Sequence, residues 1–302
     1  MMPPIRKLKA ALHRSGNALT RRLLSRPTVA EMAIEQVVLG RFFESRVGQA
    51  YGVTADDKKK MVASFQRTTT AVPSGTEWLY HVVLATEILS IPPSTPGDVI
   101  ECGCWKGAST SNLSIACARA GRRLIVADSF QGLPDDDPGV THDYPHVGVY
   151  GYYAKGMYAG RQEEVAENIR RHGDITSCHF MPGFFSETLK DLRGPIAFAF
   201  LDVDLASSMR DCVRHIWPRL EDGGFVYTDD SCDMEVVRVW FDDEWWRSEV
   251  GSRAPGYVGS GCGLPLHTTF SALGYARKVS DPAATYRTVS WLRYPGPAQA
   301  EK

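Results

Sequence analysis

Carboxylate side chains end several short apolar runs in the middle of the chain. The acids are Glu101, Asp128, Asp202 and the pair Asp229 and Asp230, which close the runs 99–100, 124–127, 196–201 and 225–228. Runs of this length and composition are typical of buried strands in a parallel sheet, and ligands of such sheets bind just outside the carboxyl ends of the strands. The pattern therefore predicts a site lined with acids along one edge of a sheet.

A glycine turn follows the first of these acids. Gly103 and Gly107 separate a predicted strand at 97–101 from a predicted helix at 108–117. Glycine permits a tight turn and lets a ligand approach the backbone closely, although glycine turns also join strands to helices for packing reasons alone. Asp128 stands about 20 residues further on, where a carboxylate binds a ribose diol in nucleotide-binding sheets. The order of these features favours a nucleoside ligand.

The spacing of the glycines argues against a dinucleotide as that ligand. Gly103 and Gly107 do not complete the G-x-G-x-x-G pattern of a dinucleotide site, and Glu101 would repel a pyrophosphate. A nicotinamide-dependent oxidoreductase is therefore the weaker alternative, and a nucleoside that carries a cationic group is favoured.

Apolar segments expected to form strands alternate with segments expected to form helices, and this alternation predicts the fold. They indicate an α/β, Rossmann-like, doubly wound and mostly parallel sheet behind an N-terminal helical cap. We expect a helical arm and cap over 1–95, in which 28–70 is one helical stretch and a further helix begins at 78, and a cofactor-binding core with a C-terminal lid or closing strands over 96–302. The other expected elements are helices at 163–171, 207–220 and 231–249, strands at 178–181, 225–228, 275–279 and 285–293, and a loop at 250–272.

Composition narrows the function classes. The 302 residues carry a net charge of -1, so no global charge favours nucleic acid, and we expect no nucleic-acid partner. Seven scattered cysteines fit a reduced, cytoplasmic setting, and no apolar run is long enough for stable membrane insertion. The basic segment 1–27 is interpreted as a solvated helix, the alternative being an arm that touches a membrane surface or a partner. A homo-oligomer is left open.

Four segments resemble class I S-adenosylmethionine-dependent methyltransferases. Within that class they resemble the macrocin O-methyltransferase (TylF-like) family of sugar O-methyltransferases. The segments are GDVIECGCWKG at 97–107, DSFQGLP at 128–134, GFFSETL at 183–189 and GGFVYTDD at 223–230, and the resemblance covers roughly residues 60–245.

The resemblance implies a role for each matching residue. Glu101, Gly103 and the turn after them would hold the methionine end of the cofactor, and Asp128 with Ser129 would hold its ribose. The complete implied cofactor set is Glu101, Gly103, Cys104, Trp105, Gly107, Ser109, Asp128, Ser129, Phe130, Gly132, Phe184, Phe185 and Asp202. A magnesium ion would be bound by Asp202, Asp229 and Asp230.

A physical argument supports that metal. An alcohol holds its proton about as tightly as water does, so it is a poor nucleophile at neutral pH. A hard cation on carboxylate oxygens stabilises the negative charge that develops on the acceptor. Asp202 and the pair Asp229 and Asp230 end strands that should be neighbours, although Asp229 and Asp230 could instead only cap a helix. Asp202 is the first candidate for the catalytic base, and His267 the second.

We therefore predict an S-adenosylmethionine-dependent, Mg²⁺-assisted O-methyltransferase. Its acceptor would be a hydroxyl on a sugar or other polyol portion of a small natural product, with a glycoside as one candidate. A metal-independent small-molecule methyltransferase and a non-catalytic binding protein with the same fold are the alternatives. Residues 206–209 read Ala-Ser-Ser-Met where the family has an aromatic-acidic-Ser-Thr run, which leaves the acceptor open. The Tyr- and Gly-rich segment 144–158 is either a lid over the acceptor or a surface loop.

Overall fold

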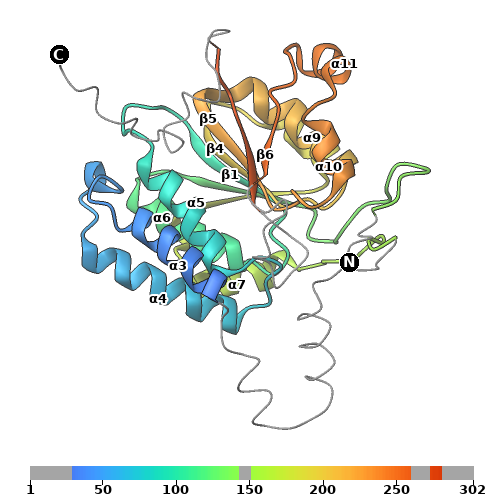
Figure 1. Ribbon diagram of the computed structural model, residues 1–302. Coiled ribbons are helices and arrows are strands. Elements are labelled where there is room, and N and C mark those ends of the chain that lie inside the picture. The colour runs from blue at the N-terminus through green and yellow to red at the C-terminus, as the bar shows by residue number, and fades with distance from the viewer. Residues whose placement is uncertain (1–28, 143–150, 260–272, 281–302) are drawn as a thin grey trace, which may run out of the picture.

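A twisted sheet forms the centre of the molecule. The computed structural model describes residues 29–142, 151–259 and 273–280. Within these ranges the sheet has seven strands in the order β3-β2-β1-β4-β5-β7-β6 (Figure 1). The strands are β1 (Asp98–Cys102), β2 (Leu124–Asp128), β3 (Cys178–Pro182), β4 (Ile196–Leu201), β5 (Leu220–Thr228), β6 (Val258–Gly259) and β7 (Gly274–Arg277). Strands β1 to β5 pair in parallel, and β7 runs antiparallel to β5 and β6.

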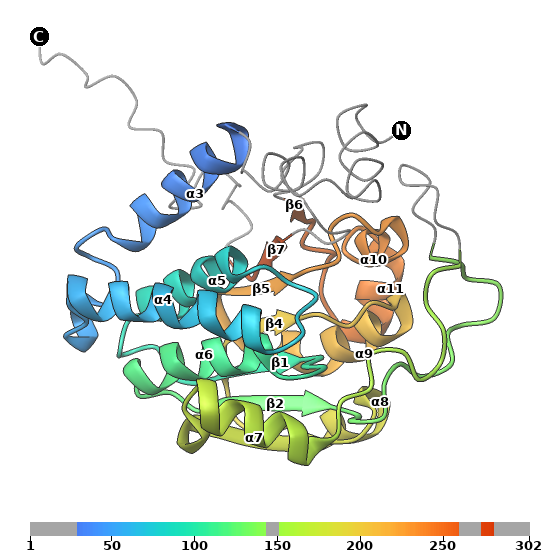
Figure 2. The same cartoon turned by 90° about the horizontal axis from the view of Figure 1, so that it is seen from below.

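Helices cover both faces of the sheet (Figures 1 and 2). One face carries α3 (Val29–Phe42), α4 (Ala55–Ala71), α5 (Trp78–Ser90), α6 (Ala108–Arg119) and α7 (Gln162–His172). The other carries α8 (Phe185–Thr188), α9 (Ala206–Ile216), α10 (Met234–Val239) and α11 (Asp243–Trp245). Short helical turns are η1 (Gln49–Tyr51), η2 (Ile175–Ser177), η3 (Leu189–Asp191), η4 (Trp217–Arg219) and η5 (Trp246–Val250). This architecture confirms the predicted doubly wound α/β fold.

Strand residues alternate between two separate apolar cores. In β1, Val99 packs with the helices of the α6 face, whereas Ile100 and Cys102 pack with those of the α9 face. The two-residue period of a strand puts Glu101 on the same face as Val99. The side chain of Glu101 is therefore fully buried beneath α6 instead of projecting from the strand end.

Two predicted helical boundaries differ from the structure. The segment 28–70 forms two helices, because Gly48 and Gly52 adopt left-handed conformations (φ 73° and 68°) between them. Thr54 then starts α4 with a reciprocal capping box to Asp57. The helix predicted over 207–220 ends at Ile216, and the turn η4 that follows contains Pro218, whose ring cannot donate a backbone hydrogen bond.

The C-terminal part of the sheet also departs from expectation. Strand β5 begins at Leu220, so the glycine pair predicted to precede it lies inside it. The predicted strand 275–279 is β7, and β6 stands in the predicted loop 250–272. The arm 1–27, the strand 285–293 and His267 lie outside the described residues. Among the described helices, none combines the length and apolarity that crossing a bilayer requires.

Candidate active site

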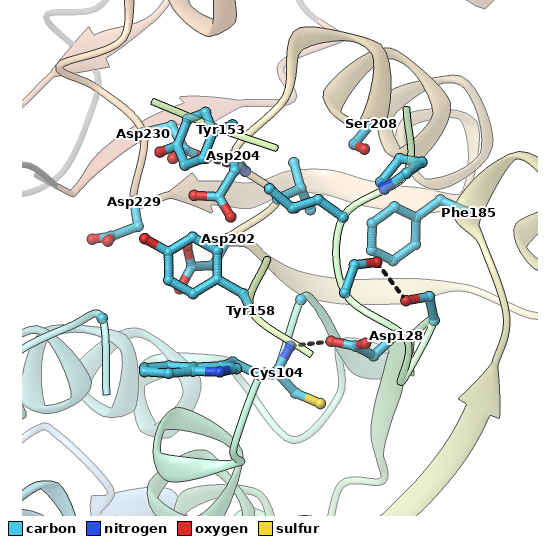
Figure 3. Close-up of a pocket in the computed structure, with 18 of the residues that line it drawn as sticks. Cys104, Asp128, Tyr153, Tyr158, Phe185, Asp202, Asp204, Ser208, Asp229 and Asp230 are labelled. Atoms are coloured by element: carbon cyan, nitrogen blue, oxygen red, sulfur yellow. Dashed lines mark hydrogen bonds between the residues drawn. The ribbon is translucent and has the colours of Figure 1, made fainter. Parts of the chain in front are cut away.

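A cavity of about 620 Å³ opens at the carboxyl ends of β1 and β4. The chain passes from β1 outward to β2 and β3 and then returns to β4 and β5, so this is the point where the strand order reverses. The loops that follow β1, β2, β4 and β5 all contribute to its walls (Figure 3). Reversal points of this kind are the usual ligand sites of open α/β sheets.

Asp128 organises one wall of the cavity. Its Oδ2 accepts a hydrogen bond from the Cys104 backbone N–H at 2.7 Å (Figure 3), and its Oδ1 accepts one from the Phe130 N–H at 2.7 Å. A carboxylate oxygen can accept two hydrogen bonds, so each oxygen keeps capacity for a ligand hydroxyl. The protein thus fixes the orientation of Asp128 while leaving a bidentate acceptor for a diol.

Gly103 lets two strand ends meet at the floor of the cavity. Its φ is 84°, and a Cβ placed there would lie 1.8 Å from the carbonyl oxygen of Asp202. No side chain fits that contact, so glycine is required both for the turn and for the approach of the β4 end.

Ten of the thirteen residues predicted to contact the cofactor line the cavity. They are Gly103, Cys104, Trp105, Ser109, Asp128, Ser129, Gly132, Phe184, Phe185 and Asp202. Gly107 instead makes room for Val165, whose Cγ1 would lie 2.9 Å from a Cβ at that position. Phe130 donates its N–H to Asp128 and packs its ring on Phe180, with centroids 6.0 Å apart.

Glu101 also lies outside the cavity wall. Burial raises the pKa of its carboxyl to about 7, with Ser109 and Thr110 partly offsetting the shift. Neither carboxylate oxygen reaches a hydrogen-bond partner of normal geometry. Glu101 is thus not among the residues that line the cavity, and its predicted contact with the methionine end of the cofactor stays a prediction.

Three carboxylates converge on the wall opposite Asp128. One oxygen from each of Asp202, Asp204 and Asp230 lies within 4.8 Å of the other two (Figure 3). Burial and the neighbouring carboxylates, Asp229 first among them, raise the pKa of Asp202 well above its usual value. Burial raises the pKa of Asp204 to about 6 and that of Asp230 well above the usual range. Hard oxygen donors held this close are the set that Mg²⁺ takes from proteins.

This group differs from the predicted metal set by one member. Asp204, which was not in the predicted set, occupies the position expected for Asp229. Asp229 still lines the cavity and lies next to Asp202 (Figure 3). The left-handed conformation of Asp204 (φ 62°) turns its backbone N–H toward Asp230 Oδ2 at 3.3 Å. Sequence spacing alone does not reveal this reversal of the backbone.

Backbone strain is concentrated around the cavity. In the described ranges, four non-glycine residues have positive φ, namely Trp105, Phe130, Tyr158 and Asp204. Three of them line the cavity, and Phe130 contacts the Asp128 carboxylate. Such conformations persist only where the surrounding structure enforces them, and they gather at ligand sites.

Aromatic residues that the sequence left between two interpretations form part of the wall. Tyr152, Tyr153 and Tyr158 face the cavity, and the ring of Tyr158 packs edge-on against Trp105 with centroids 5.4 Å apart. Residues 143–150 of the same segment, which include His146, lie outside the described residues. These tyrosines therefore line the cavity, and their density in the sequence was the signal for a role there.

The segment that departs from the family pattern also lines the cavity. Ser207 and Ser208 of α9 reach its wall, and the Ser207 hydroxyl donates to Asp136 Oδ1 at 3.2 Å. Residues 73–76, which the sequence did not indicate, close another side. His81 holds them, since its Nε2 lies 2.6 Å from the Thr76 hydroxyl, and burial lowers the pKa of His81 to about 3.

Comparison with known proteins finds O-methyltransferases both among family profiles and among individual relatives. The profile of the macrocin-O-methyltransferase (TylF) family matches residues 34–253. An 8-demethyl-8-(2,3-dimethoxy-alpha-L-rhamnosyl)-tetracenomycin-C 4'-O-methyltransferase from Streptomyces olivaceus is 35% identical over 45% of this chain and 53% of its own length. A demethyldecarbamoylnovobiocin O-methyltransferase from Streptomyces niveus is 32% identical over 45% of this chain and 53% of its own. The chain therefore spans about half the length of these relatives.

A solved structure shares the fold. The O-methyltransferase NovP superposes with a TM-score of 0.54 at 21% identity, over 73% of this chain and 97% of that one. At that identity the similarity concerns the arrangement of helices and strands.

Proposed function

The chain belongs to the macrocin-O-methyltransferase (TylF) family, and on that basis we propose that it is an S-adenosylmethionine-dependent, Mg²⁺-assisted O-methyltransferase. The proposed acceptor is a hydroxyl on a sugar or other polyol portion of a small natural product. One observation carries the proposal: Asp128 and the group Asp202, Asp204 and Asp230 line the same cavity. One set suits a ribose and the other suits a divalent cation.

The cofactor side fits a nucleoside. Asp128 presents oriented oxygens to a diol, and Gly103 removes the side chain that would block the turn. Phe184 and Phe185 lie beside this wall, as expected for residues near an adenine. When bound, S-adenosylmethionine would supply an electrophilic methyl group and Mg²⁺ would supply a Lewis acid.

The opposite wall fits a metal and a base. Asp202, Asp204 and Asp230 would hold the Mg²⁺, because in the described part of the chain no lysine or arginine forms an ion pair with any of the three. Asp202 is the residue that we propose accepts the acceptor proton. The tyrosine wall would orient the acceptor so that its oxygen lies in line with the methyl group.

The relatives indicate the acceptor class. The Streptomyces olivaceus relative is named for methylation of a tetracenomycin that bears a rhamnosyl group. Another relative, from Micromonospora griseorubida, is named a mycinamicin III 3''-O-methyltransferase and is 31% identical over 45% of this chain and 56% of its own length. We propose a glycosylated natural product of this general kind, with Ser207 and Ser208 giving the pocket its own acceptor preference.

Two measurements test the proposal together. Calorimetry with S-adenosylhomocysteine, with and without Mg²⁺, should show cofactor binding that does not depend on the metal. A screen of hydroxylated glycosides with a labelled methyl donor should then identify an acceptor. Asp204→Asn should weaken Mg²⁺ binding by about tenfold or more, since it removes one charged ligand.

The control for that variant is Asp191→Asn, at an exposed position in η3. It should bind Mg²⁺ as the parent does. Cofactor binding without transfer to any acceptor would favour the non-catalytic alternative, and full turnover in EDTA would favour the metal-independent one.

A further inference from the structure

A buried histidine joins two carboxylates behind the acceptor wall. The side chain of His142 is 2% exposed, its Nδ1 lies 2.5 Å from Asp233 Oδ2, and its Nε2 lies 3.0 Å from Asp136 Oδ2. Asp136 belongs to the segment that follows β2, whereas Asp233 belongs to the turn between β5 and α10. His142 therefore ties the segment that follows β2 to Asp233, which lies 91 residues after His142 in the sequence.

Two contacts connect His142 to the carboxylate group. The first runs through Asp233, whose backbone N–H donates to the Asp230 carbonyl at 3.0 Å and whose side chain caps α10 through the Glu235 N–H. The second runs through Tyr153, whose ring packs edge-on against the His142 ring with centroids 5.4 Å apart. The hydroxyl of Tyr153 hydrogen-bonds the Asp204 carboxylate, and Figure 3 shows the two side chains together.

The charge of His142 suits this position. Burial lowers the pKa of His142, but the hydrogen bond to Asp233 and the charges of Asp233 and Asp136 outweigh burial, so the net shift is upward. A protonated imidazole is a donor at both nitrogens, so it can satisfy two carboxylates at once. Asp233 is buried, and a buried acid without such a partner would be costly, so the placement of Asp233 depends on His142.

We propose that His142 is a positioning residue for the Mg²⁺ site: it sets the turn that carries Asp230 and, through Tyr153, the side chain of Asp204. This inference rests on the proposed metal-assisted function. His142 touches neither the cofactor side nor the carboxylate group directly, so its loss should change metal binding and leave cofactor binding intact. Partners in the outer shell of metal ligands commonly change metal affinity by about 10- to 100-fold.

The test uses His142→Gln in the full chain. We expect Mg²⁺ affinity, measured by calorimetry, to fall by about tenfold or more, and kcat with the identified acceptor to fall with it. The dissociation constant of S-adenosylhomocysteine and the KM for the methyl donor should stay within about twofold of the parent values, because Asp128 and Cys104 are untouched. The same substitution at His179, which is exposed on β3, is the matched control and should change neither.

A second variant keeps the inference testable if His142→Gln does not fold. Tyr153→Phe removes only the hydroxyl that reaches Asp204, and we expect it to weaken Mg²⁺ binding by a few-fold. In the double variant the two effects should not add, since both act on the same group.

Three results would overturn the inference. If His142→Gln and Tyr153→Phe both bind Mg²⁺ within twofold of the parent affinity, His142 does not position the Mg²⁺ site. An equal loss of Mg²⁺ and S-adenosylhomocysteine affinity would show that His142 supports the fold in general, and fully additive effects would show that the two contacts are unrelated. A parent protein that binds no Mg²⁺ would instead refute the proposed function itself, before any variant is compared.

Discussion

Asp128 combines a structural role with the ribose-binding role that we propose for it. Both of its oxygens accept backbone N–H groups, from Cys104 and Phe130, and both retain capacity for a ribose. Asp128→Asn removes the charge and one acceptor. Hydrogen bonds to a charged group contribute about 1.5–3 kcal/mol, so we expect affinity for S-adenosylhomocysteine to fall by about 10- to 100-fold in calorimetry.

The control for that variant is Asp56→Asn, on the exposed surface of α4. It should bind S-adenosylhomocysteine normally. Unchanged affinity in Asp128→Asn would mean that the ribose is held elsewhere.

Glu101 should make the stability of the protein depend on pH. Burial raises the pKa of the folded carboxyl to about 7, whereas the pKa of the free side chain is 4.5. The folded state therefore binds more protons between these values, and the free energy of unfolding falls as the pH rises through them. Glu101→Gln removes this loss. We expect the free energy of unfolding of the variant, relative to wild type, to rise by about 3 kcal/mol between pH 5 and pH 8.

Denaturant unfolding of the variant and the wild type, without ligand and at both pH values, measures this change. Any effect of the substitution on packing is the same at both pH values, so it cancels when the two are subtracted. A difference that does not change with pH would place the Glu101 pKa near its ordinary value.

Residue types at the site were partly predictable from the sequence. Asp128, Asp202 and Asp230 stand at strand ends, and a strand end is visible as the limit of an apolar run. Asp204 was not predictable as part of the group, because its contribution depends on a left-handed backbone that L-residues rarely adopt. Glu101 was expected in the cavity, but the alternation of side chains along β1 places it under α6.

At the scale of elements, the junction of β1 and β4 depends on Gly103. Gly103→Ala would bring a methyl group against the Asp202 carbonyl in a conformation that alanine tolerates poorly. We expect a loss of about 3 kcal/mol or more in the free energy of unfolding, together with loss of S-adenosylhomocysteine binding. Denaturant unfolding and calorimetry measure the two effects.

Gly121→Ala is the matched control for this variant. Gly121 also has a positive φ, of 61°, but nothing lies within 4 Å of a Cβ there. It should lose only about 1 kcal/mol and keep full cofactor affinity. Equal losses in the two variants would show that φ alone, and not the contact with Asp202, makes glycine necessary at 103.

Strongly apolar elements were predicted closely, whereas the boundaries of several other elements were not. Strand β4 matches its predicted range because all six of its residues are buried. The break between α3 and α4 escaped prediction, since it depends on two glycines and a capping box within an otherwise helical composition. Strand β5 extends across its glycine pair because Leu220, before the glycines, also pairs with β4, at Ile196. A register shift between Ile196 and Phe198 accommodates the extra residues.

At the scale of the whole molecule, topology brings the two halves of the site together. The end of β2 supplies the nucleoside wall, while the ends of β4 and β5 supply the carboxylate group. This arrangement followed from the sequence, because carboxyl ends of parallel strands meet at one edge of a sheet. The sequence left the role of the tyrosines open and gave no role to His142, because these residues lie in connections whose course no short-range pattern determines.

Methyl transfer to the identified acceptor, measured in EDTA and again after Mg²⁺ is restored, tests the metal-assisted mechanism most directly. We expect EDTA to lower turnover by about 100-fold or more and Mg²⁺ to restore it, with S-adenosylhomocysteine affinity unchanged throughout. Full turnover in EDTA would contradict the mechanism and leave Asp202, Asp204 and Asp230 to orient the acceptor without a metal.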